Sequence, residues 1–290
     1  MAGMSDYSAQ ALINWATGNR SMPATANRFL ALFTAAPTSD AGTGGTEVSG
    51  GAYARVQVAG AVAATASFTT ASPNITMTTN PGWVVPGMNV YDATNSTQIG
   101  TVLTYSGTAL VLTANAAASS SGSTDSLIFS AFPAASASSG TEPAVTPAQA
   151  ATGAAISFAQ STASWGTVVA IGVYDAVTSG NLIWFDYLGN YKWSPFSCTS
   201  ASPGVLTCTD QTFVNGQFAA VTAKFGGTLP TTAGSWSGIL TVAGVSGQTF
   251  NLGVNTTAIG DGLVRQVVQQ SVPINNVVTF SSGQLILQAA

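Results

Sequence analysis

The apolar residues of this chain come in short runs that are separated, every few residues, by Gly, Ser, Asn or Pro. Such runs are too short for ordinary helices, and several of them alternate apolar with polar residues, as half-buried strands do. The strand-like runs lie at 29–34, 53–58, 168–174, 182–187, 277–280 and 285–287. Short strands with frequent turn residues favour an all-β fold over an α/β fold. We therefore predict a jelly-roll or β-sandwich base domain.

One short helix is predicted near the N-terminus. Asp6 or Ser8 can cap it, because both side chains accept hydrogen bonds from free backbone N–H groups. Ala11, Leu12 and Trp15 follow at helical spacing and share one face, and Gly18 ends the pattern. The remainder of the chain is predicted to be β.

Two internal blocks resemble each other. In the first, a Ser106-Gly107 turn precedes Leu110 and Leu112; in the second, Ser246-Gly247 precedes Phe250 and Leu252. Apolar residues two apart lie on the same face of a strand, so each block predicts a half-buried hairpin. A shared module and convergence of two unrelated hairpins are both compatible with so short a match.

The blocks suggest how the chain is divided. The first block is flanked by Ala/Ser/Gly/Thr-rich stretches at 116–124 and 134–140, which are typical of linkers. We predict two small β modules, at 68–139 and 193–263, inserted into one discontinuous base domain. That base domain is predicted to comprise 1–67, 140–192 and 264–290.

The chain is nearly uncharged. Among 290 residues there are six Lys/Arg, ten Asp/Glu and no His, whereas about a quarter of the residues in an ordinary soluble domain are charged. The side chain best suited to acid–base catalysis at neutral pH is therefore missing, and we expect no enzyme. The net charge of −4 disfavours nucleic-acid binding. The chain has no long uninterrupted apolar stretch, so the sequence does not predict membrane insertion.

Paired carboxylates are the main catalytic chemistry left to consider. Asp175 and Asp186 lie at the ends of neighbouring predicted strands, with Trp184, Tyr187 and Trp193 nearby. Two carboxylates beside aromatic rings suit carbohydrate cleavage or binding. The alternative, which we favour, makes Asp175 a turn residue and the aromatic residues part of a core or an interface.

Two further constellations have structural explanations that we favour. Asp40 and Glu47, in the glycine-rich segment 38–51, could provide oxygen ligands for calcium, but glycines there also suit a long loop. Cys198 and Cys208 could face each other across a hairpin and form a disulfide, or be two small apolar residues of a β module. We thus expect no catalytic, cofactor-binding or metal-binding residues, and no cofactor.

Several segments carry a resemblance to a known family. The chain has FLALFTAAP at 29–37, DAG at 40–42, EVSGGAYAR at 47–55, WG at 165–166, GVYDA at 172–176, SGNL at 179–182 and GQL at 283–285. These segments resemble a family of tailed-phage virion proteins usually labelled phage tail fibre proteins, whose members often begin with a short helix. The resemblance covers roughly 5–60, 154–190 and 265–290, and it is interrupted at the two predicted modules.

The resemblance implies a structural component of a tailed-phage particle, made and assembled in the host cytoplasm and located in the virion. Such a fibre protein would self-associate, as a dimer or trimer, and attach to the tail or to the head around the tail. Its partners would be an adaptor, capsid or linking fibre protein. A capsid decoration protein (cement or head spike) and a host-glycan-binding receptor protein are the alternatives. The absence of a basic, apolar leader at the N-terminus predicts no secretory signal.

Overall fold

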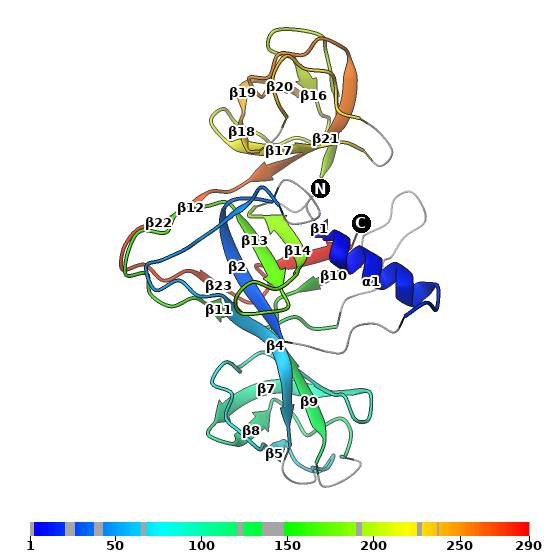
Figure 1. Ribbon diagram of the computed structural model, residues 1–290, viewed down its shortest axis with the longest axis vertical. Helices are drawn as coiled ribbons and strands as arrows, with labels where there is room; N and C mark the ends of the chain where they lie inside the picture. Colours follow the sequence, from blue (N-terminus) through cyan, green and yellow to red (C-terminus); the bar gives the residue numbers. More distant parts are fainter. Residues whose placement is uncertain are drawn as a thin grey trace.

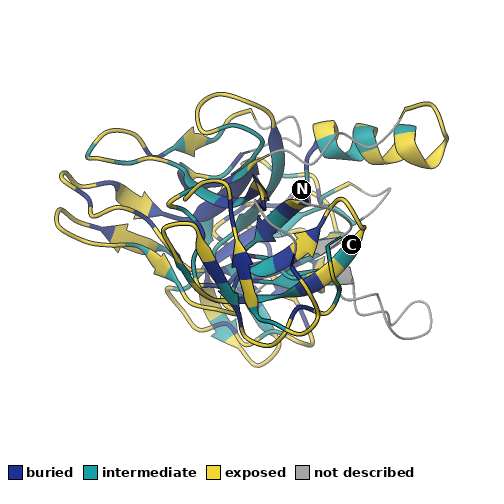
Figure 2. Cartoon of the chain, turned by 90° about the horizontal axis from the view of Figure 1, so that it is seen from below, coloured by how far each residue is buried: buried dark blue, intermediate teal, exposed yellow. Residues whose placement is uncertain are grey.

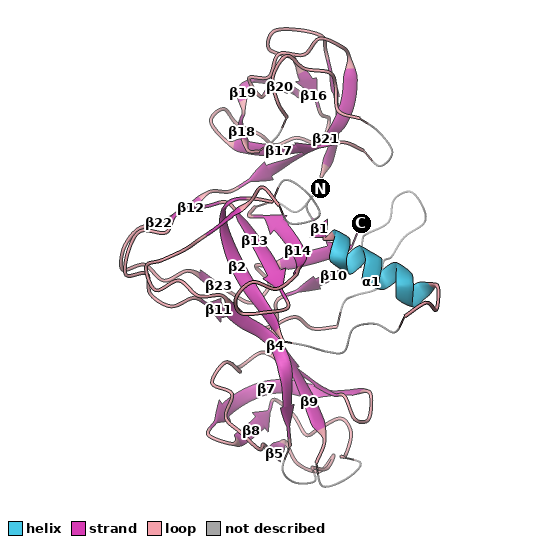
Figure 3. Ribbon diagram, in the orientation of Figure 1, coloured by secondary structure: helices cyan, strands magenta, loops and turns pink. Residues whose placement is uncertain are grey.

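The computed structural model describes residues 3–20, 27–37, 43–64, 68–120, 124–134, 148–189, 193–224, 228–236 and 238–289. Within these ranges the chain forms one helix and otherwise strands, turns and loops (Figure 3). The predicted all-β fold with a short N-terminal helix is confirmed. The molecule is elongated, with a group of strands at each end of its long axis and a further group between them (Figure 1).

The central group contains the helix and strands from both ends of the chain. Its elements are α1 (Asp6–Ala16), β1 (Gly3–Met4), β2 (Arg28–Ala35), β3 (Thr46–Glu47), β10 (Ala148–Ala151), β11 (Ile156–Ser157), β12 (Gly166–Val168), β13 (Ala170–Tyr174), β14 (Leu182–Tyr187), β22 (Gln270–Val272), β23 (Thr279–Phe280) and β24 (Ile286–Ala289). Strands β1, β14, β13 and β2 pair side by side in one antiparallel sheet. The pairs β10–β24, β11–β23 and β12–β22 form separate two-stranded ribbons.

The middle of strand β2, Phe29–Phe33, is apolar because both of its faces are covered. Leu30 and Leu32 point into the largest core cluster, whereas Ala31 and Phe33 pack in a second cluster on the opposite face. A strand buried on both faces reads as a continuous apolar run rather than as an alternating one. This burial accounts for the FLALF segment.

The first end group is a closed antiparallel sheet. It consists of β4 (Val56–Ala63), β5 (Asn74–Thr76), β6 (Asn89–Asp92), β7 (Thr97–Ser106), β8 (Ala109–Leu112) and β9 (Ser126–Ser130). The strand order is β4-β9-β6-β7-β8-β5, and a bridge between Ala64 and Met77 closes the ring. Because β4 also pairs with β2, this sheet continues the central one, and residues of both share one core cluster.

The second end group is also closed but has its own core. It consists of β15 (Ser194–Cys198), β16 (Leu206–Thr207), β17 (Phe218–Thr222), β18 (Leu240–Thr241), β19 (Ala243–Ser246), β20 (Thr249–Asn251) and β21 (Gly260–Val267). The strand order is β18-β17-β21-β15-β16-β20-β19, and β18 leads directly into β19. Phe196, Leu206 and Phe250 are buried in a cluster that contains residues of this group alone.

The two closed sheets share detailed hydrogen bonding. Each has the predicted hairpin, closed by the pair Ser106–Ala109 in one and Ser246–Thr249 in the other. Upstream, the N–H of Gly87 donates to the carbonyl of Val102, and the N–H of Gly216 donates in the same way to Val242. The likeness of the two blocks therefore extends beyond the hairpins that first indicated it.

Several predicted boundaries are wrong. The helix is capped by Ser5, not by Asp6 or Ser8, and none of its residues is buried. Residues 53–55 lie in a loop before β4, because the backbone turns at Ala52, which has a φ of 62°. The run 168–174 is divided at Val169, where the chain passes from the ribbon β12–β22 into the sheet of β13. The last two runs form shorter or shifted strands, β23 and β24.

Gly247 provides a test of the hairpin geometry. Its φ is 57°, and a Cβ atom added there would meet nothing within 4 Å. The cost of Gly247→Ala is therefore purely conformational, and we expect the free energy of unfolding to fall by about 1 kcal/mol. Gly247→Asn should cost less, since Asn tolerates this conformation. Urea unfolding measures both variants; equal stability of Gly247→Ala and wild type would contradict the assignment.

Candidate functional site

Several of the segments that carry the family resemblance, at 29–37, 47–55, 165–166, 172–176 and 179–182, meet around one ion pair. Glu47, at the end of β3, binds Arg55 through two parallel contacts, Nε–Oε1 at 2.8 Å and Nη2–Oε2 at 2.7 Å. The Arg55 side chain is only 8% exposed. Although burial lowers the pKa of Arg55, the hydrogen bonds and charge of Glu47 outweigh it and raise that pKa above its ordinary value. This pair is the centre of what we call the clasp (Glu47, Tyr53, Arg55 and Tyr174).

Tyr53 connects the ion pair to the central sheet. Its hydroxyl accepts a hydrogen bond from the backbone N–H of Leu32 at 2.9 Å and donates one to Oε1 of Glu47 at 3.0 Å. Burial, and to a lesser degree the negative charge of Glu47, raise the pKa of Tyr53 well above its usual range. The ring of Trp165 packs edge-on against Tyr53 at 5.5 Å, and its Nε1 donates to the carbonyl of Gly51.

Arg55 also fixes the turn that follows β13. Its Nη1 donates to the carbonyls of Ala176 and Ser179 at 2.9 and 2.6 Å, and its guanidinium lies 3.5 Å from the centre of the Tyr174 ring. The clasp therefore ties β2, β3 and the turn after β13 together. These contacts pair the carboxylate of Glu47 and the guanidinium of Arg55 with other groups of the same chain. Such pairing is typical of residues that hold a fold together.

The two candidate catalytic carboxylates do not meet. Asp175 caps the turn by accepting hydrogen bonds from the N–H and the side-chain amide of Asn181. Asp186 lies at the other end of the same hairpin, opposite Ile171. Four residues of extended strand between 171 and 175 span about 13 Å. The two carboxylates therefore have separate roles, and Asp175 is a turn residue, as the favoured interpretation had it.

Asp186 instead pairs with Arg265, which comes from β21 of the second closed sheet. Arg265 is 2% exposed, also donates to the carbonyl of Tyr187 at 3.0 Å, and lies near the rings of Tyr187 and Trp193. Among the described residues, its Nε has no hydrogen-bond partner. Burial raises the pKa of the Asp186 carboxyl and lowers that of Arg265, against the attraction between them. Sequence reasoning missed this pair because 79 residues separate its members.

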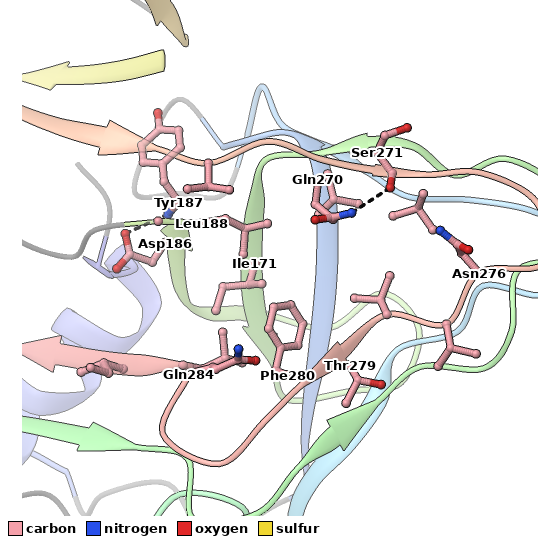
Figure 4. Close-up of a pocket in the computed structure, with 18 of the residues that line it drawn as sticks. Ile171, Asp186, Tyr187, Leu188, Gln270, Ser271, Asn276, Thr279, Phe280 and Gln284 are labelled. Atoms are coloured by element: carbon pink, nitrogen blue, oxygen red, sulfur yellow. Dashed lines mark hydrogen bonds between the residues drawn. The ribbon is translucent and has the colours of Figure 1, made fainter. Parts of the chain in front are cut away.

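A cleft of about 560 Å³ lies beside this ion pair. Figure 4 shows its walls: Gln270 and Ser271 come from β22, and Thr279, Phe280 and Gln284 come from β23 and the loop after it. Ile171 and Leu188 contribute from the sheet side. Most of the lining is apolar, and apart from Asp186 and Arg265 its polar groups are uncharged. A mainly apolar cleft whose two charged lining residues pair with each other suits an apolar segment better than a charged ligand.

The remaining candidates are placed as follows. Cys198 and Cys208 are free, buried thiols in the core of the second closed sheet, and burial raises the pKa of both. Glu47 is engaged in the clasp, whereas Asp40 lies outside the described residues. Within the described ranges, no three His, Cys, Asp or Glu side chains gather where they could hold a metal ion. No helix of the described chain is long and apolar enough to cross a membrane.

The fold is all-β and the clasp holds its central sheet together, and a comparison with family models adds a more particular finding. Residues 3–132 match the family described as Podophage GP4 fiber I protein gp80. This match indicates a phage fibre structural protein and confirms the resemblance to a phage tail fibre family. The matched range includes most of the first predicted module, and the predicted likeness at 154–190 and 265–290 lies outside it. No curated protein and no solved structure matches the chain.

Tyr53→Phe tests the clasp. It leaves the buried N–H of Leu32 without its acceptor, so the free energy of unfolding should fall by about 1–3 kcal/mol. Tyr105→Phe is the matched control, because the hydroxyl of Tyr105 binds the carbonyl of Thr79 at an exposed position where water can replace it. Chemical denaturation compares the two; equal losses would show that Tyr53 has no special role.

The ion pair Asp186–Arg265 predicts a pH dependence. A carboxyl whose pKa is raised by folding contributes stability fully below its unfolded pKa, about 4, and loses that contribution as the pH rises through the raised value. As the pH rises from about 4, we expect the free energy of unfolding of the double variant Asp186→Leu/Arg265→Met to increase relative to that of wild type. At neutral pH the variant should be at least as stable as wild type. Denaturation across pH measures the difference; the opposite slope would contradict the stated direction.

Proposed function

We propose that this chain is a fibre subunit of a tailed-phage particle that self-associates and attaches to the tail, or to the head around the tail. The observation that carries the proposal is the match of residues 3–132 to a podophage fibre family. Other virion proteins, such as an adaptor, capsid or linking fibre protein, are its proposed partners. Assembly in the host cytoplasm and a final location in the virion belong to the same proposal.

The distribution of charge supports this role. The ion pairs Glu47–Arg55 and Asp186–Arg265 are largely buried, whereas Lys224–Asp261 is exposed. With only 16 charged residues (six Lys/Arg and ten Asp/Glu) in the whole chain, the outer surface consists mainly of neutral polar and apolar groups. Contacts through such a surface depend on apolar burial and hydrogen bonds, which salt screens little.

We also propose the three-part division of the chain into a base domain (1–67, 140–192 and 264–290) and modules at 68–139 and 193–263. The separate core of the second closed sheet supports the second module. The first module shares its core and strand β4 with the base, so we expect it to unfold together with the base. In a fibre, the two closed sheets would extend the subunit at both ends of its long axis.

Self-association is testable with purified protein. We expect sedimentation at micromolar concentration to show a dimer, a trimer or a larger species. The distribution should change little between about 0.1 and about 1 M NaCl, over which the Debye length falls from about 10 to about 3 Å. A monomer under both conditions would contradict the proposal. Counting copies per particle separates a tail-associated fibre from a capsid decoration protein, which would cover the shell in far larger numbers.

A further inference from the structure

Among the described residues, helix α1 is attached to the rest of the molecule at its N-terminal end only. Ser5 and Ser8 donate hydrogen bonds from their hydroxyls to the carbonyls of Leu182 and Ile183 on β14. Beyond this attachment the helix projects from the body, and most of its length is exposed (Figure 2). No residue of the helix is buried, and its large apolar side chains, Tyr7, Leu12, Ile13 and Trp15, are all exposed.

The composition of α1 does not suit a helix surrounded by water. Tyr7, Ala11, Leu12 and Trp15 recur at spacings of three and four residues and form one apolar face, which we call the α1 face. Leu12 is 39% and Trp15 55% exposed. A helix of 11 residues is marginal in water on its own, and helices in proteins gain most of their stability by packing an apolar face. The α1 face is therefore suited to being covered by a partner.

The cleft has the complementary character. Its walls are mainly apolar, its uncharged polar groups include Gln270, Asn276 and Gln284, and no residue of α1 lines it. The helix is attached near Leu182, at the start of β14, whereas the cleft begins at Asp186, near the end of the same strand. The chain thus presents an uncovered apolar helix and an apolar cleft at two different places.

We propose that the α1 face of one copy docks in the cleft of a second copy. Charge supports this occupant: α1 contains Asp6 but no Lys or Arg, and Asp186 and Arg265 in the cleft neutralise each other. Two neutral surfaces can meet without repulsion despite the net charge of −4 on each copy. The absence of basic residues also makes α1 a poor ligand for an anionic membrane or for nucleic acid.

The contact is heterologous, because different surfaces of the two copies meet. A bound pair still presents one free helix and one free cleft, so repetition gives either a closed ring or an open filament. The inference rests on the proposed self-association of the subunit and specifies the surfaces that produce it.

Two complementary variants test the proposal. Leu12→Ala/Trp15→Ala removes the α1 face while keeping good helix-forming residues. Val268→Glu/Val277→Glu places charges on two exposed residues that line the cleft, so folding is not at stake. We expect each variant to weaken association by about a hundredfold or more, as the loss of two buried apolar side chains would. An equimolar mixture should form heterodimers and nothing larger, because one intact helix and one intact cleft remain.

Matched controls are Ile13→Ala, on the opposite side of α1, and Ile274→Glu, an exposed residue outside the cleft. Both should associate like wild type in sedimentation, and circular dichroism should be the same for all variants. Wild-type association by the two double variants would overturn the docking proposal and leave self-association standing. Double variants that are monomeric and stay monomeric when mixed would also overturn it. A monomeric wild type would refute the proposed self-association itself.

Discussion

The buried ion pair between Glu47 and Arg55 is the interaction on which the central part of the molecule depends. It joins an edge strand, a loop and the turn after β13 to the buried strand β2, with Tyr53 as the hydrogen-bonded link. The chain has few charges, yet two of them are buried here. Burying an ion pair costs desolvation free energy, so it is favourable only when the hydrogen bonds of the pair are well satisfied. Here the carboxylate receives both arms of the guanidinium, and two carbonyls accept further N–H groups. The residues of the segment 47–55 are thus explained by packing and hydrogen bonding.

A buried ion pair is also found where the second closed sheet joins the rest of the molecule. A second internal pair, Asp186–Arg265, lies where the second closed sheet meets strand β14 of the central group, and burial works against it. Ile239 of the second sheet packs against the apolar cluster of Ala31 and Phe33, which adds a favourable contact at this junction. The closed sheets have few free edges for unwanted strand pairing. The surface, which has few charges, also carries an exposed helix and a mainly apolar cleft.

Much of this fold could be predicted because its signals are local. Strand β14 has the predicted bounds, and both hairpins follow from a Ser-Gly turn and two apolar residues at period two. The pairing of Asp186 with Arg265 could not be predicted, because it depends on how distant strands are ordered. The helix shows another limit: spacing reveals that Leu12 and Trp15 share a face, but not whether the chain itself covers that face. Its cap was misplaced because Ser5, Asp6 and Ser8 all have capping side chains, and only the backbone decides among them.

We propose that this chain is a structural fibre subunit of a phage particle. An electron cryomicroscopy reconstruction of the whole particle tests it most directly, because the elongated subunit with a closed sheet at each end has a recognisable shape (Figure 1). The account predicts density of this shape, in repeated copies in contact with one another, in an appendage of the tail or of the head around the tail. Particles that contain no such density, and from which the protein is absent, would contradict it.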